Sequence, residues 1–106
     1  ESCCKGLMRG LLALMDTQYI IKSNRESGDV RYDISLIPRE KGYPGIIMEL
    51  KWKKNLTEKE LAGLAVTALN KINEMRYDAE MREYGIQKIL KFGVAFSGKR
   101  VKVETI

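Results

Sequence analysis

Residues 45–52 read GIIMELKW, and this stretch decides the fold of the chain. Its apolar opening has the length and the β-branched character of a buried strand. Because side chains alternate between the two faces of a strand, Glu49 and Lys51 must share one face, while Met48 and Leu50 point the other way. A charge at a buried sheet position is costly unless it is paired or bound to a metal ion. Two opposite charges on this face are therefore unusual for a purely structural strand.

The segment before this stretch predicts its partner strand. Residues 31–37 (RYDISLI) have strand character, and Pro38 ends the strand because proline cannot donate a ladder hydrogen bond. The polar connection at residues 39–44 (REKGYP) contains the Gly and Pro of a turn. We therefore expect the two strands to form an antiparallel hairpin.

The register of this hairpin determines which charges meet. If the hairpin is centred near Lys41, Asp33 lies directly opposite Glu49. Opposed residues share a face, with Cβ atoms roughly 5 Å apart, and like charges at such positions are normally avoided. Two carboxylates and Lys51 would then converge at one point, where a divalent cation would relieve the repulsion between the acids.

Length and composition limit the class of protein. With 106 residues, of which 44% are hydrophobic and 31% charged, the chain is typical of one globular domain. It begins at Glu1 rather than Met, so we expect residues 1–106 to be a single domain cut from a longer protein. No apolar run approaches the roughly 20 residues that span a bilayer, so we expect no membrane partner. The net charge of +5 suits a polyanionic partner.

The missing residue types exclude several chemistries. The chain has no histidine, which excludes Ser-His-Asp and Cys-His catalysis and zinc bound by imidazole. Its two cysteines, Cys3 and Cys4, are adjacent, so they provide neither a disulfide framework nor a cysteine zinc site. Two reduced thiols suit a cytoplasmic protein. Any chemistry must use carboxylates, lysine, tyrosine or a hard metal ion.

Hydrophobic periodicity and turn residues predict five further elements. These are a helix over residues 1–15, a strand over 19–23, a helix that begins at the capping box of Thr57 and runs to Gly85, and strands over 86–96 and 100–106. The long helical crossover allows the strands on either side of it to run parallel. The predicted fold is thus an α/β protein with a mixed β-sheet flanked by helices, in the order α-β-β-β-α-β-β.

This order, with Asp33 and the Glu49-x-Lys51 pair on neighbouring strands, resembles the PD-(D/E)xK nuclease superfamily and its restriction-endonuclease-like core. The likeness is greatest to the nuclease-like domain that lies C-terminal to a predicted AAA-ATPase-like domain in many bacterial proteins (the DUF1703 type). The resemblance covers essentially the whole chain. The stretches that carry it are residues 23–29 (SNRESGD), 31–34 (RYDI), 46–51 (IIMELK) and 91–99 (KFGVAFSGK).

The resemblance implies a metal-dependent nuclease that hydrolyses phosphodiester bonds in DNA, or less readily in RNA. Asp33 and Glu49 would bind Mg²⁺ or Mn²⁺, with the main-chain carbonyl of Leu50 as a further ligand. Lys51 would assist the attacking water. Glu1 is the candidate for the acid that related nucleases often add from the first helix. The resemblance also implies the ATPase-like domain of the parent chain as a partner, and a homodimer is a further possibility.

Other residues are candidates for accessory roles. Lys53 and Lys54 extend a basic cluster that could contact phosphate, although solvated strand ends often look like this. Trp52 could stack on a base but more often such a residue covers a core. Glu26 could join the metal site, although a solvated loop acid is the simpler interpretation. Lys71 stands where many related nucleases carry Gln, with Tyr77 following it.

Two departures from the family pattern motivate alternative functions. The segment Cys3-Cys4-Lys5 stands where relatives of this branch have an aromatic pair and His, and Lys71 replaces the Gln. One alternative is a catalytically inactive module that keeps the nuclease fold and serves nucleic-acid or protein binding or regulation. Another is a purely structural domain in which Asp33, Glu49 and Lys51 form a half-buried ion-pair cluster.

Overall fold

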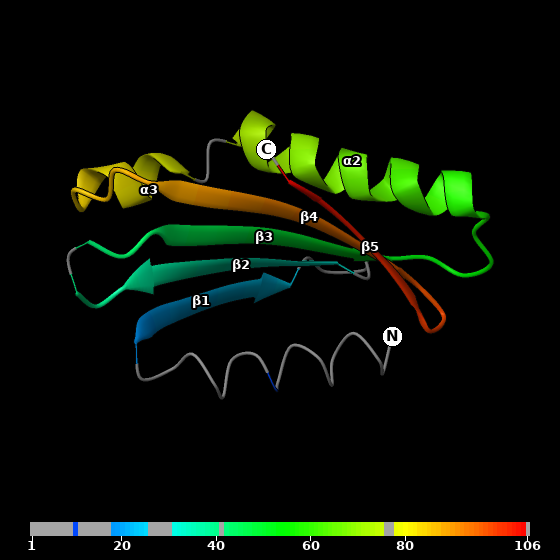
Figure 1. The fold of residues 1–106 in the computed structure, drawn as a ribbon, viewed down its shortest axis with the longest axis horizontal. Coiled ribbons are helices and arrows are strands. Elements are labelled where there is room, and N and C mark those ends of the chain that lie inside the picture. The colour runs from blue at the N-terminus through cyan, green and yellow to red at the C-terminus, as the bar shows by residue number, and fades with distance from the viewer. Residues whose placement is uncertain (1–9, 11–17, 26–30, 41, 76–77, 106) are drawn as a thin grey trace.

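The computed structural model describes residues 10, 18–25, 31–40, 42–75 and 78–105. This part of the chain forms one five-stranded sheet and two helices (Figure 1). The strands are β1 (Tyr19–Arg25), β2 (Arg31–Pro38), β3 (Gly45–Trp52), β4 (Ile89–Ser97) and β5 (Arg100–Thr105), and the helices are α2 (Glu58–Met75) and α3 (Asp78–Glu83). Neither helix in these ranges is long and apolar enough to span a lipid bilayer.

The strands follow one another across the sheet in the order β1-β2-β3-β4-β5. The β2–β3 hairpin is antiparallel, as predicted, and β3 runs parallel to β4 because the chain crosses over through α2 and α3. β1 and β5 pair antiparallel with β2 and β4 at the two edges. The mixed α/β sheet predicted from the sequence is confirmed.

The capping box that predicted the start of α2 is present. The Thr57 amide donates to Glu60 Oε1 at 2.9 Å, and the Glu60 amide donates to Thr57 Oγ1 at 3.2 Å. The hydrogen bond from the Thr57 amide holds the pKa of the Glu60 carboxyl below its usual value. The reciprocal bonds satisfy amides that the first turn of a helix would otherwise leave without an acceptor.

The prediction of one helix from Thr57 to Gly85 is wrong, because α2 ends at Met75 and a second helix, α3, begins at Asp78. The apolar stripe continues across the break, so periodicity alone does not reveal it. Asp favours helix starts over helix interiors, since its side chain competes for backbone hydrogen bonds. Lys91 on β4 also joins the two helices, with its Nζ 3.1 Å from Asn73 Oδ1 and 3.6 Å from Asp78 Oδ2.

Two other element boundaries bear on the predictions. Gly85, with φ of 84°, follows α3 as the sequence predicted, because a positive φ suits glycine at the end of a helix. The strand expected from residue 86 begins only at Ile89. The reason is that Ile86 packs in the helix-side core instead of continuing the strand. The predicted helix over residues 1–15 lies outside the described residues.

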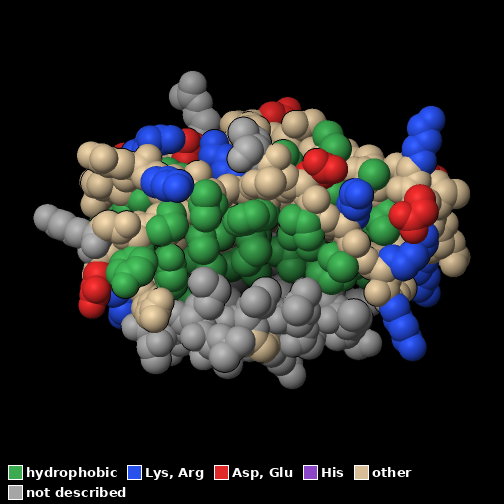
Figure 2. All heavy atoms as spheres, in the orientation of Figure 1, with side chains coloured by type: hydrophobic (Ala, Val, Ile, Leu, Met, Phe, Trp, Pro, Cys, Tyr) green, Lys and Arg blue, Asp and Glu red, His purple; other side chains and the backbone are tan. Residues whose placement is uncertain are grey.

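Apolar clusters of the described residues cover both faces of the sheet. On the face beneath α2 and α3, the core contains Ile37, Ile47, Leu69, Ile72 and Met81. On the opposite face it contains Tyr19, Ile34, Leu36, Leu50, Val94 and Phe96, and Trp52 packs against it. Figure 2 shows hydrophobic side chains gathered in a band across the middle of the molecule, with many of the charged side chains toward its ends.

Candidate active site

Glu49 is a fully buried carboxylate in the centre of the sheet, with none of its surface exposed. It lies on the helix-side face of β3, beside Gly93 of β4 in the parallel ladder. At Gly93 the backbone of α2 comes so close that a Cβ atom would lie 2.3 Å from the Ala65 carbonyl oxygen and 2.5 Å from the Leu69 nitrogen. Glu49 is therefore buried beside Gly93, a position where the lack of a side chain allows α2 to pack closely on the sheet.

Asp33 lies directly opposite Glu49 in the antiparallel β2–β3 ladder, which is the register that the sequence predicted. It is half-buried and points to the helix side, since Ile37 on the same face packs in the helix-side core while Ile34 packs in the other. Lys51, two residues after Glu49, shares this face and is also half-buried. The structure thus brings two carboxylates and one amine to the same side of the sheet.

The donor set at this position fits a hard divalent cation. A fully buried carboxylate such as Glu49 requires a positive partner or a proton. In the described ranges no group of three or more His, Cys, Asp or Glu residues is arranged to hold a metal ion. Mg²⁺, however, typically keeps several waters and is bound through one or two carboxylates together with substrate phosphates. Asp33 and Glu49 supply that number of carboxylates.

The other predicted site residues are less closely gathered. Lys53 and Lys54 are exposed beyond the end of β3, and Lys54 Nζ lies 5.9 Å from the ring centroid of Trp52, which packs on the face opposite Glu49. Lys71 is half-buried on α2. Three further candidates lie outside the described residues: Glu1, Glu26 and Tyr77.

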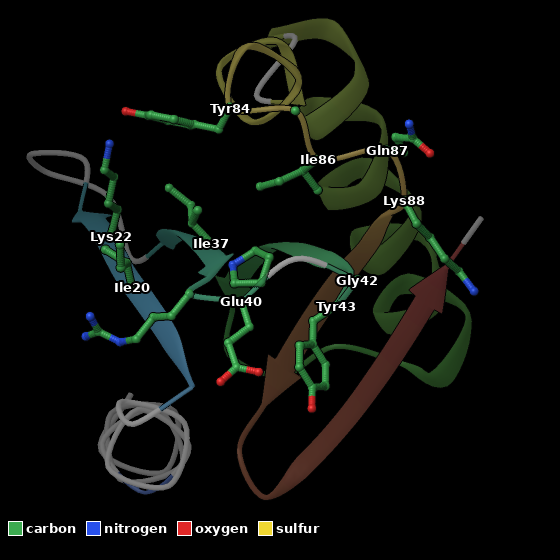
Figure 3. Close-up of a pocket in the computed structure, with 13 residues that line it drawn as sticks. Ile20, Lys22, Ile37, Glu40, Gly42, Tyr43, Tyr84, Ile86, Gln87 and Lys88 are labelled. Carbon is green, nitrogen blue, oxygen red and sulfur yellow. The ribbon is translucent and has the colours of Figure 1, made fainter.

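A hollow of about 950 Å³ at the other end of β2 was missed by the sequence analysis (Figure 3). Its lining comes from β1, the β2–β3 connection and the segment after α3, so no single stretch of sequence reveals it. The residues that line it are Ile20, Lys22, Ile37, Pro38, Arg39, Glu40, Gly42, Tyr43, Tyr84, Gly85, Ile86, Gln87 and Lys88. We call it the α3 hollow.

One ion pair lies at the rim of the α3 hollow, and α3 also carries Asp78, which pairs with two cations. Lys22 Nζ lies 2.6 Å from Glu80 Oε1, and this hydrogen bond raises the pKa of Lys22. Burial alone would raise the pKa of the Asp78 carboxyl, but the hydrogen bond from Arg82 at 3.3 Å and the charge of Lys91 outweigh it and lower the pKa. Lys22 on β1 and Lys91 on β4 thus each contact an acid of α3, Glu80 and Asp78 respectively.

Comparison with known protein families agrees with this geometry. The model of the PD-(D/E)XK nuclease superfamily matches residues 1–106, which is the whole chain. No curated protein matches the chain. The family match and the resemblance carried by Asp33 and the Glu49-x-Lys51 pair lead to the same assignment. This chain belongs to the PD-(D/E)XK nuclease superfamily.

Proposed function

We propose that the domain is a metal-dependent nuclease that hydrolyses phosphodiester bonds in DNA. Membership of the superfamily indicates nuclease activity in general and a nucleic-acid substrate. The observation that carries the proposal is the fully buried Glu49, paired in register with Asp33 and on the same face as Lys51. Such a convergence of acids is unfavourable unless a cation joins them, and a divalent ion would do so.

In this proposal, each residue of the site has a distinct task. Asp33 and Glu49 would hold Mg²⁺ or Mn²⁺, with the carbonyl of Leu50 as a further oxygen ligand. Such an ion would lower the pKa of a bound water and polarise the phosphate. Lys51 positions the attacking water and stabilises the negative charge that develops on the phosphate oxygens. Because Glu49 is fully buried, the charges at its carboxylate act in an environment with little water, where electrostatic interactions are stronger.

The remaining assignments are predictions from the sequence. Glu1, Glu26, Lys71 and Tyr77 are proposed to have accessory roles, and Lys53 and Lys54 are proposed to contact the nucleic acid backbone. The ATPase-like partner domain, a homodimer and a bacterial, cytoplasmic setting belong to the same group of predictions.

Cleavage assays with a matched pair of lysine variants test the proposal. Purified domain is incubated with supercoiled plasmid or single-stranded DNA and either Mg²⁺, Mn²⁺ or EDTA. We expect cleavage only with the metal ions. Lys51→Ala should reduce the rate by about 10²-fold or more, the cost of removing one group that stabilises transition-state charge. Lys99→Ala, at an exposed position in the turn between β4 and β5, should leave the rate unchanged.

Two outcomes of this assay would contradict the proposal. Equal cleavage by wild type and Lys51→Ala would remove Lys51 from the mechanism. Binding of DNA without cleavage under any metal condition would instead support a catalytically inactive module that keeps the nuclease fold.

A further inference from the structure

The α3 hollow has an apolar floor that is open to solvent. Ile20, Ile37 and Ile86 form this floor, and Ile20 keeps 43% of its surface exposed. Figure 3 shows Ile86 reaching from the segment after α3 toward Ile37, and the two pack in one cluster. A concave apolar surface of this size with a few polar groups at its edge is typical of a ligand site.

The rim of the hollow carries an aromatic ring and a cation on the same side. Tyr84, directly after α3, is 64% exposed, and Lys22 on β1 is also exposed. Figure 3 shows both residues at the edge of the hollow. The ion pair between Lys22 and Glu80 is solvent-exposed, with 51% and 56% of the side chains accessible. Such a pair contributes little to stability, so a phosphate can replace Glu80 at low cost.

The charges that line the hollow favour an anion. Among the described residues of its lining, three are cations, Lys22, Arg39 and Lys88, and one is an anion, Glu40, which gives a formal net charge of +2. Glu80, which pairs with Lys22 at the rim, reduces this to +1, still positive, in a chain whose own net charge is +5. A base that stacks on an aromatic ring while its phosphates contact lysine or arginine is the usual binding mode for single-stranded nucleic acid.

The hollow and the candidate active site lie on the same face of β2. Lys22 on β1 pairs with Ser35 on β2, and Asp33 lies two residues further along the same face. Ile37, on the floor of the hollow, is four residues from Asp33, or about 13 Å along the strand. A single strand that reaches Asp33 would need only a few nucleotides to span this distance.

We propose that the α3 hollow binds an unpaired base of the substrate, with Tyr84 as the stacking platform and Lys22 as a phosphate contact. The nuclease would therefore prefer single-stranded nucleic acid. A base inside a duplex is stacked on both faces and paired at its edge, so it cannot offer its face to Tyr84. This inference rests on the proposed function, because the same strand must reach Asp33 and Glu49.

Binding measured without metal separates this inference from catalysis. Fluorescence anisotropy in EDTA would compare a labelled oligothymidylate with a blunt duplex of equal length. We expect the single strand to bind at least tenfold more tightly. Tyr84→Ala should weaken its binding by about 5- to 150-fold, the range for loss of one base-stacking aromatic, and Tyr84→Phe should not. Duplex binding should be the same in all variants.

Val66→Ala is the control. Val66, on α2, is 43% exposed and is not among the described residues that line the hollow. We expect this variant to bind the single strand within twofold of wild type. Equal affinity for single strand and duplex, or equal effects of Tyr84→Ala and Val66→Ala, would overturn the inference.

Three combinations of results distinguish this inference from the proposed function. If Lys51→Ala loses cleavage but binds the single strand as wild type does, both stand. If neither wild type nor any variant cleaves DNA, but Tyr84→Ala still weakens single-strand binding, the nuclease proposal fails and the base-binding site stands. If cleavage requires Lys51 but binding is indifferent to Tyr84, only the base-binding site fails.

Discussion

At the scale of a single residue, the opposed carboxylates of Asp33 and Glu49 lead to a stability prediction. Without metal, two acids on one face repel each other, so Asp33→Asn should leave the free energy of unfolding unchanged or raise it by up to about 1 kcal/mol. With saturating Mn²⁺, wild type should gain stability because the ion binds only the folded state, by about 2.7 kcal/mol at one hundred times the dissociation constant. Asp33→Asn should lose that gain. Urea unfolding in EDTA and in Mn²⁺ measures both effects.

Asp78→Asn is the control for this residue-scale prediction. Asp78 contacts Arg82 and Lys91, away from the ladder of Asp33 and Glu49, and its lowered pKa shows that its charged form stabilises the fold. Its replacement should lower stability alike in both buffers and keep the Mn²⁺ gain. A loss of about 3–5 kcal/mol for Asp33→Asn in EDTA would instead indicate a structural ion-pair cluster, because that is the cost of breaking a buried pair.

The sequence is sufficient to predict where these residues lie relative to one another, but not how deeply Glu49 is buried. Alternation along β3 and the length of the turn before it are local properties, and they are sufficient to place Glu49 beside Lys51 and opposite Asp33. Glu49 is fully buried, and its neighbour in the parallel ladder is Gly93, 44 residues later in the chain, where α2 packs closely on the sheet. That contact between distant segments has no local signal.

At the scale of elements, Gly93 sets the distance between α2 and the sheet. A methyl group there would meet backbone atoms of Ala65 and Leu69, which cannot move without shifting the helix. Gly93→Ala should therefore lower the free energy of unfolding by about 1–3 kcal/mol, the usual cost of overpacking. Thermal or urea unfolding of the metal-free protein gives the value.

Gly63 provides a matched glycine in α2 itself. It is exposed, and a Cβ atom there would meet nothing within 4 Å. Gly63→Ala should therefore raise stability by about 0.5–1 kcal/mol, because alanine loses less backbone entropy in a helix. If the two alanine variants had the same effect, the close approach of α2 at Gly93 would not determine the packing of this layer.

The elements themselves follow from local patterns, except where tertiary contacts decide a boundary. The capping box at Thr57 and the glycine at Gly85 mark where the helical region begins and ends. The break before Asp78 was missed because hydrophobic periodicity continues through it. Lys91, on a strand that is distant in sequence, bonds to both sides of the break, and only the folded chain brings it there.

At the scale of the whole molecule, the positive charges that line the α3 hollow predict how the affinity for single-stranded DNA depends on salt concentration. The affinity for single-stranded DNA falls with salt because each neutralised phosphate releases counterions, with a slope of about −0.7 per contact in a plot of log K against log salt. If Lys22, Arg39 and Lys88 each contact one phosphate, the slope should be about −2. Lys22→Ala should reduce its magnitude by about 0.7. Glu80→Ala, which removes the acid beside Lys22, should strengthen binding instead.

Tyr84→Ala separates stacking from charge in the same titration. Stacking releases no counterions, so this variant should bind more weakly at every salt concentration with an unchanged slope. Anisotropy titrations from about 50 to 200 mM salt, in EDTA, give both the intercept and the slope for each variant. A change of slope in Tyr84→Ala would mean that the ring orders the phosphate contacts rather than stacking alone. An unchanged slope in Lys22→Ala would place the bound strand away from the α3 hollow, because Lys22 stands at its rim and pairs with Ser35, two residues from Asp33.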